Sequence, residues 1–156
     1  MAGTGYDSVG GVVKFNPQTA SDRSALLELG GVVYVASASY GDADPYHGWI
    51  IGFSASNLAR TIVFNTTPNG QRGGIWGGPL ASDGTFVYTA IGNGTWDGGP
   101  DWGDTYLKLS PVSGTLSVAD FFTPSNQKTL NTDDRDLGSA MATRCPPSHP
   151  VNSRTS

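Results

Sequence analysis

The stretch Gly31-Val32-Val33-Tyr34-Val35-Ala36 decides the fold, because it returns as Gly84-Thr85-Phe86-Val87-Tyr88-Thr89-Ala90. Two further blocks return at a similar spacing, Ile51-Gly52-Phe53-Ser54 as Leu107-Lys108-Leu109-Ser110, and Asn65-Thr66-Thr67-Pro68 as Phe121-Phe122-Thr123-Pro124. The spacing is roughly 54 to 56 residues, and each block reads as a short strand. The chain therefore contains an internal repeat built from β-strands.

Alternation of apolar and polar residues, bounded by Gly, Ser, Asn and Pro, predicts four strands in each repeat. The first unit has expected strands at 24–29, 32–38, 49–54 and 59–65. The second has them at 76–81, 86–91, 105–110 and 116–122. Four-stranded units at this period are typical of a β-propeller, whose blades stack around an axis.

The predicted fold class is all-β, a partial β-propeller of four-stranded antiparallel blades with an irregular C-terminal tail. We expect residues 1–23 to be the remnant of a preceding blade, 24–66 the first complete blade, and 67–124 the second with its link. Residues 125–140 read as a link and the start of a further blade, and 141–156 as an irregular tail. Because a closed propeller has about four to eight blades, we expect further blades of a longer chain or self-association.

Composition excludes several classes of protein. The net charge is −4 and the nine Lys and Arg are scattered, so we expect no nucleic-acid partner. No apolar run reaches the roughly 20 residues that span a bilayer, and the N-terminus does not read as an export signal. Cys145 is the single cysteine, so an intrachain disulfide is excluded.

The blocks Gly31 to Ala36, Gly48-Trp49-Ile50-Ile51-Gly52-Phe53-Ser54-Ala55 and Tyr106 to Ser110 resemble the repeats of pyrroloquinoline-quinone-type (PQQ-like) propellers. The resemblance covers about residues 1 to 140. The resemblance implies an extracytoplasmic location for the full-length protein. Propellers of this type include quinoprotein dehydrogenases, which hold calcium and PQQ. The chain departs from those enzymes, because a single cysteine excludes their adjacent-cysteine disulfide and the repeat ending at Ser54 to Arg60 lacks the usual Gly and Trp.

Antiparallel blades place the long loops and the links between blades on one face, and the tight hairpin turns on the other. Eight of the thirteen acidic residues and the four Trp fall in or beside the long loops and links. Trp and Asp in exposed loops suit sugars, small polar ligands or a cation, although Asp also caps turns and Trp also fills gaps between sheets. The candidate ligand-binding residues are Asp42, Asp44, His47, Arg72, Trp76, Asn93, Trp96, Asp97, Asp101, Trp102 and Asp104.

Catalytic chemistry has little support in these loops, and we assign no catalytic residue. Asp42 and Asp44 alternate as calcium ligands can, but no complete calcium loop follows. Asp97, Asp101 and Asp104 could supply an acid and a base for glycoside hydrolysis, which depends on a separation that sequence does not give. A hydrolase or phosphate-loop motif is missing.

The sequence favours a non-catalytic scaffold that binds a protein or a small polar ligand, such as a carbohydrate, through the loops of one face. The alternative is a fragment of a PQQ-dependent, calcium-assisted alcohol or sugar dehydrogenase. PQQ and calcium are expected only under that alternative. The repeat marks the scaffold, and function is expected where the two copies differ, at 39–48 and 92–104.

Overall fold

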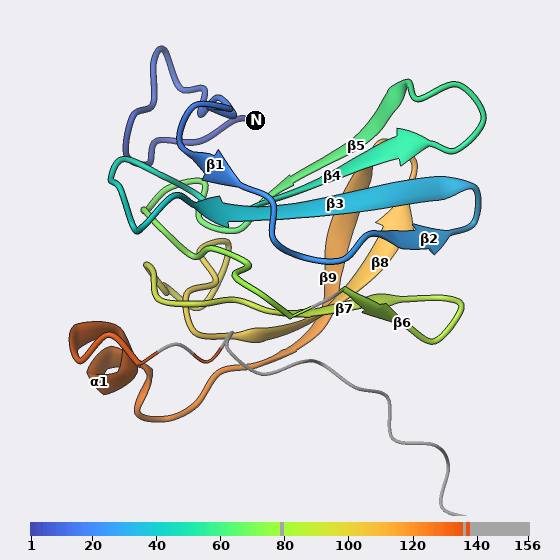
Figure 1. The fold of residues 1–156 in the computed structure, drawn as a ribbon. Coiled ribbons are helices and arrows are strands. Elements are labelled where there is room, and N and C mark those ends of the chain that lie inside the picture. Colours follow the sequence, from blue (N-terminus) through green and yellow to red (C-terminus); the bar gives the residue numbers. More distant parts are fainter. Residues whose placement is uncertain (79, 136, 138–156) are drawn as a thin grey trace, which may run out of the picture.

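Two antiparallel β-sheets face each other in the computed structural model, which describes residues 1–78, 80–135 and 137 (Figure 1). Sheet 1 contains β1 (Ala20–Ser21), β2 (Leu27–Leu29), β3 (Val32–Ser39), β4 (Trp49–Ser54) and β5 (Arg60–Asn65). Sheet 2 contains β6 (Ala81–Ser82), β7 (Val87–Ala90), β8 (Tyr106–Val112) and β9 (Thr115–Phe122), and a short helix α1 (Gln127–Thr132) follows. The predicted all-β class and antiparallel order are confirmed, and neither sheet is closed.

The edge strand of each sheet is shorter than the sequence predicts. The expected strands 24–29 and 76–81 are wrong in their first parts, since β2 begins at Leu27 and β6 at Ala81. In sheet 1 the edge of β3 is shared, because β1 pairs with its end, β2 pairs with its start, and Ile75 donates its N–H to Ser37 between them (3.2 Å). The link to sheet 2 thus occupies a hydrogen-bonding position that a continuous strand would have filled.

Sheet 2 repeats this split edge. β6 pairs with the first half of β7. Beyond β7, residues of the link between the sheets take the edge position, where Gly73 N–H bonds to Asn93 O (2.7 Å) and Gly92 N–H to Gly74 O (2.9 Å). A β-bulge also recurs, because the register of β4 and β5 shifts between Gly52 and Phe53 and that of β8 and β9 between Lys108 and Leu109. The repeat of the sequence is therefore a repeat of structure down to its irregularities.

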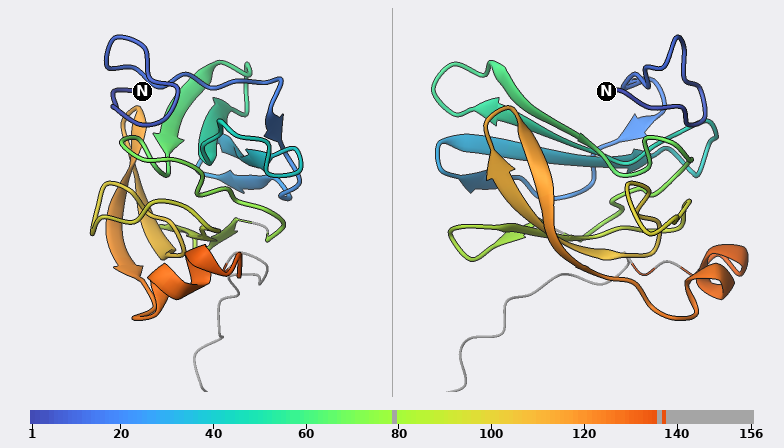
Figure 2. Two further views of the ribbon diagram at one scale, coloured as in Figure 1. Left: turned by 90° about the vertical axis from the view of Figure 1, so that its left-hand side faces the viewer. Right: turned by 180° about the vertical axis from the view of Figure 1, so that it is seen from behind.

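The core lies between the sheets, and each sheet contributes a different face to it (Figure 2). Sheet 1 buries Tyr34 and Ile50 there, whereas sheet 2 buries Val87 and Leu107. The repeat equivalents of Tyr34 and Ile50 are Tyr88 and Tyr106, which are half-buried outside this core cluster. The two sheets therefore stack head to tail, with one face of the first unit on the opposite face of the second.

The end of the N-terminal region joins sheet 1. β1 falls inside the segment 1–23 that the sequence assigns to a preceding blade, and it pairs with β3. Ahead of it, Met1 and Val13 exchange backbone hydrogen bonds, and the Phe15 ring packs edge-on against Trp49 at 6.0 Å. This segment covers part of the outer face of β4.

The expected link at 125–140 forms α1 in its described part. The inner strand expected to begin at 136–140 lies outside the described residues, apart from Leu137. The expected tail 141–156, with Cys145, lies outside them entirely. Among the described residues, no helix is long and apolar enough to cross a membrane.

The hairpin turns follow from their glycines and one aspartate. Gly30 and Gly31, with φ of 62° and 78°, form the two-residue turn between β2 and β3, and positive φ at both positions is the type I′ geometry that fits strand twist. Between β6 and β7 the Asp83 carboxylate accepts hydrogen bonds from the N–H groups of Phe86 and Thr85, both at 2.9 Å, and from the Tyr88 hydroxyl at 2.8 Å. These donors, the Phe86 N–H foremost, lower the pKa of Asp83 to about 2.

The contribution of this turn to stability should depend on pH. Because the folded-state pKa of Asp83 lies below its ordinary value of 3.8, its ionised form stabilises the fold above about pH 4, and this stabilisation disappears as the pH falls to about 2. We expect Asp83→Asn to lower Tm near neutral pH and to differ less from wild type near pH 2. Melts followed by circular dichroism at several pH values test this, and a Tm difference that does not change with pH would contradict it.

Candidate functional site

Four segments meet at the end of the molecule opposite the hairpin turns. They are the β3–β4 loop (40–48), the β5–β6 link (66–80, Pro79 not described), the β7–β8 loop (91–105) and the N-terminal segment (1–16). Figures 1 and 2 show them gathered at one end with α1 beside them, and we call this end the loop face. The eleven candidate residues from the sequence lie in or at the ends of these segments.

Backbone hydrogen bonds join the segments of the loop face across long sequence distances. Arg72, whose φ of 64° is left-handed, donates its N–H to Tyr46 O at 2.8 Å and accepts one from Gly48 at 3.1 Å. The same link bonds to the β7–β8 loop, where Thr95 donates to Gln71 O at 3.1 Å. Satisfied backbone groups of this kind hold the loops in one arrangement.

Arg72 also forms the main ion pair of the loop face. Its guanidinium binds both carboxylate oxygens of Asp44, at 3.1 and 2.5 Å. The hydrogen bond to Asp44 raises the pKa of Arg72. Both side chains are about one-third exposed, so the pair adds on the order of 1 kcal/mol or less to stability. Its role is to fasten the β3–β4 loop to the link.

His47 is buried and has partners at both ring nitrogens. Its Nε2 lies 2.7 Å from Tyr6 O and its Nδ1 lies 3.0 Å from Thr67 Oγ1. A carbonyl oxygen only accepts, so Nε2 carries a proton and donates it to Tyr6. His47 therefore anchors the N-terminal segment to the loop face and presents no nitrogen to solvent.

Asp101, Asp104 and Asn93 are also buried and act within the scaffold. Asp101 accepts the Asn69 N–H at 2.9 Å, and burial raises the pKa of Asp101. Gln127 of α1 donates to Asp104 at 3.3 Å, and Asn93 donates to Asp134 at 2.7 Å. The structure does not bring Asp97, Asp101 and Asp104 together as an acid and base pair facing solvent, since only Asp97 is exposed.

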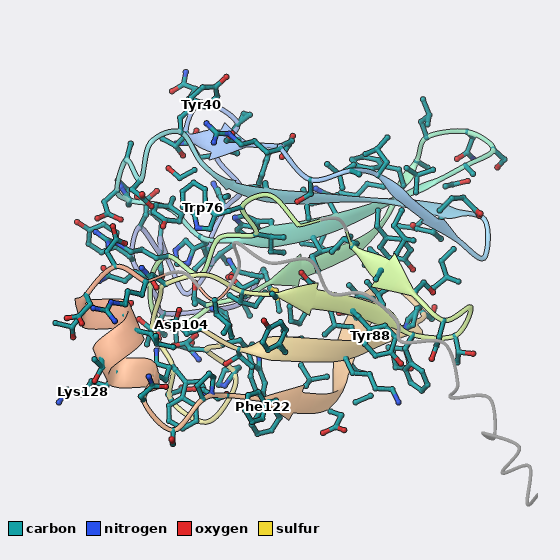
Figure 3. The ribbon with its side chains drawn as sticks, turned by 60° about the horizontal axis from the view of Figure 1, so that its bottom comes forward. Tyr40, Trp76, Tyr88, Asp104, Phe122 and Lys128 are labelled. Carbon is teal, nitrogen blue, oxygen red and sulfur yellow. The ribbon has the colours of Figure 1, made fainter. Side chains whose placement is uncertain are left out.

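The three tryptophans of the candidate set differ in exposure. Trp76 packs edge-on against Tyr46 at 5.9 Å, and Trp102 is buried against Phe121 at 5.0 Å. Trp96 is 40% exposed. Figure 3 shows Trp76 and Asp104 at the loop end of the ribbon, with Lys128 of α1 beyond them. Trp96 is therefore the member of this group with a surface to offer a ligand.

The metal hypothesis for Asp42 and Asp44 does not fit the arrangement of their side chains. Asp42 accepts a hydrogen bond from the Tyr46 hydroxyl at 2.9 Å, and Arg72 takes both oxygens of Asp44. Within residues 1–78, 80–135 and 137, no three His, Cys, Asp or Glu side chains are placed to hold a metal ion. The carboxylates of Asp42 and Asp44 are thus already engaged by partners within the loop face.

A polar hollow on the loop face was missed by the sequence analysis. It has a volume of about 560 Å³, and we call it the loop-face hollow. Tyr6 is 50% exposed beside it. Little in the sequence indicates this hollow, because residues 4–8 fall in the segment expected to be the remnant of a preceding blade. Its lining is Thr4, Gly5, Tyr6, Asp7, Ser8, Asn69, Gly70, Gln71 and Thr95.

The comparisons with known proteins add no relative. No family model matches the chain, and no curated protein or solved structure matches it with significance.

Proposed function

We propose that the chain forms two successive blades of a propeller and serves as a binding scaffold through its loop face. The support for the blades is the head-to-tail stacking of the two sheets, together with the recurrence of the split edge and of the bulge after Gly52 and Lys108. A stack of this kind continues by adding further units on either outer face, as in repeat arrays. The long loops of successive units then form one surface.

The proposed ligand is a neutral oligosaccharide bound in the loop-face hollow. The observation that carries this proposal is the hollow itself, a polar depression of about 560 Å³ beside an exposed tyrosine. Tyr6 offers a ring face for a sugar to stack on, and Asn69, Gln71 and Thr95 offer amide and hydroxyl groups for its hydroxyls. Trp96 follows Thr95 directly and is a second aromatic at the margin.

Charge on the loop face favours a neutral ligand over an anionic one. Asp7 is the one charged residue among the described residues that line the hollow, Asp97 is exposed next to Trp96, and Arg72 is paired with Asp44. The chain as a whole carries −4. An anionic sugar would therefore be repelled by the surface around the hollow.

Titration of the full chain with maltotriose, cellotriose, xylotriose and galactotriose, followed by isothermal calorimetry, tests the proposal. We expect saturable binding of at least one trisaccharide, weakened about tenfold by Tyr6→Ala and less strongly by Gln71→Ala. Tyr40→Ala is the matched control, because Tyr40 is 68% exposed and does not line the hollow. Absence of binding by all four sugars, or equal losses in Tyr6→Ala and Tyr40→Ala, would reject the hollow as their site.

A further inference from the structure

A second cleft lies at the opposite end of the molecule, between residues of the hairpin turns of the two sheets. It has a volume of about 520 Å³, and we call it the hairpin cleft. Leu29, Val32 and Ile62 of sheet 1 and Pro111 and Val112 of sheet 2 form apolar walls. Every residue that lines it is uncharged. This volume is within the usual range of small-molecule sites, about 300–1,000 Å³.

Tyr34 supplies a polar group to this cleft. The residue is 1% exposed and lines the hairpin cleft, and within the described ranges its hydroxyl makes no hydrogen bond to protein. The hydroxyl oxygen is also not one of the fully buried side-chain atoms that lack a partner, so it reaches the surface at the cleft. A hydroxyl without a protein partner, placed at the wall of a cleft, is free to donate to a ligand.

In the second copy of the repeat, the tyrosine equivalent to Tyr34 has a hydrogen-bond acceptor within the protein. This residue, Tyr88, on the hairpin half of sheet 2 in Figure 3, donates its hydroxyl to Asp83 at 2.8 Å. The residue equivalent to Asp83 in sheet 1 is Leu29, as the registers show, since Leu27 pairs with Tyr34 and Ala81 with Tyr88. Leu29 is itself a wall of the cleft. The first copy thus lacks the acceptor that Tyr88 has, and it carries an apolar side chain at that position.

Gly52 adds no side chain to the walls of the cleft. It lies opposite Tyr34 in the ladder with β4, and a Cβ there would be 2.9 Å from both Ile62 and Val32. Its equivalent in sheet 2 is Lys108, which carries a long side chain over the Phe86 ring. The first copy therefore has less side-chain volume beside its tyrosine than the second.

We propose that the hairpin cleft binds a flat apolar molecule carrying one hydrogen-bond acceptor, such as an aromatic ketone, with the Tyr34 hydroxyl as donor. The apolar walls supply the bulk of the binding free energy, because ligand binding removes their apolar surface from water. The hydroxyl fixes orientation and selects for the acceptor. A tyrosine hydroxyl keeps its proton at neutral pH, and burial raises the pKa of Tyr34 further. A carboxylate ligand is disfavoured, because the lining offers no positive charge.

Two ligands of nearly the same shape test the hydrogen bond. The full chain is titrated with 2-acetylnaphthalene and with 2-ethylnaphthalene, and binding is followed by naphthalene fluorescence. We expect the ketone to bind about fivefold more tightly than the hydrocarbon, as one neutral hydrogen bond allows. Tyr34→Phe should abolish this ratio while leaving hydrocarbon affinity unchanged, and Tyr88→Phe, the matched loss of a phenol at the equivalent position, should preserve the ratio.

A surface variant tests the location without touching the core. Ser113 is exposed in the turn between β8 and β9 and lines the cleft, so Ser113→Trp should obstruct it and weaken both ligands together. Tyr6→Ala, at the other end of the molecule, should change neither affinity, which separates this site from the loop-face hollow. Failure of both ligands to bind saturably, a ketone preference that survives Tyr34→Phe, or full binding in Ser113→Trp would overturn the proposal.

Discussion

Replacing Gly48 by alanine is expected to lower the free energy of unfolding by about 3 kcal/mol, at the upper end of the usual cost of overpacking. A Cβ at position 48 would overlap the carbonyl oxygen of Gly73 and lie 2.7 Å from Thr66 Oγ1. Both atoms belong to the buried link, and Thr66 Oγ1 already donates to Gly73 O at 2.7 Å. The backbone of the link would have to move, which would weaken the hydrogen bonds that join the loops of the loop face.

The matched control is Gly77→Ala in the same link. A Cβ at Gly77 meets no atom within 4 Å, and its φ is not left-handed. We therefore expect stability unchanged or raised by about 0.5 kcal/mol, through the lower entropy of the unfolded chain. Urea denaturation of both variants makes the comparison. If Gly48→Ala is as stable as Gly77→Ala, the loops are not packed backbone to backbone as described.

Leu109→Ala is expected to cost about 4 kcal/mol, because Leu109 is fully buried between the sheets and its loss leaves a cavity. Phe53 occupies the equivalent repeat position in β4 but lies outside the core cluster and is only half-buried. Phe53→Ala removes a larger side chain, yet we expect it to cost less than half as much. The order of the two costs is thus the reverse of the order of side-chain size.

Chemical denaturation of the two variants, with similar slopes against denaturant as a check on the unfolding model, tests the head-to-tail stacking. Ile50→Ala tests the face that only the first unit buries. Ile50 is fully buried, whereas its equivalent Tyr106 is half-buried. A larger loss in Phe53→Ala than in Leu109→Ala would mean that the faces are not used as described.

The strands were predictable because the repeated blocks carry their own pattern. Tyr34 and Tyr88 mark the same strand position in both copies, and alternation around them gives the strand with little dependence on distant residues. The split edge was not predictable, because it depends on Ile75 reaching Ser37 from another unit. The face that each sheet buries was also not predictable, since Val33 and Val87 occupy equivalent positions in the repeat but only Val87 enters the core.

The candidate site was predictable in place but not in detail. Antiparallel order puts the long loops at one end of the sheets, which is where the structure has them (Figure 1). Burial of His47 and Asp101 was not predictable, because their partners Tyr6 and Asn69 are distant in sequence, 41 and 32 residues away. Polar residues in loops are expected at the surface, and the hydrogen bonds between loops reverse this expectation.

We propose that the repeated sheets form a scaffold and that a neutral sugar binds in the loop-face hollow. Mapping of backbone amide chemical shifts, during titration of the full chain with the four trisaccharides, tests it most directly. We expect shifts concentrated at residues 4–8, 69–71 and 95–96, with the amide signals of the hairpin turns at 30–31 and 113–114 unchanged. Shifts at the hairpin turns alone, or no shifts with any of the four sugars, would contradict it.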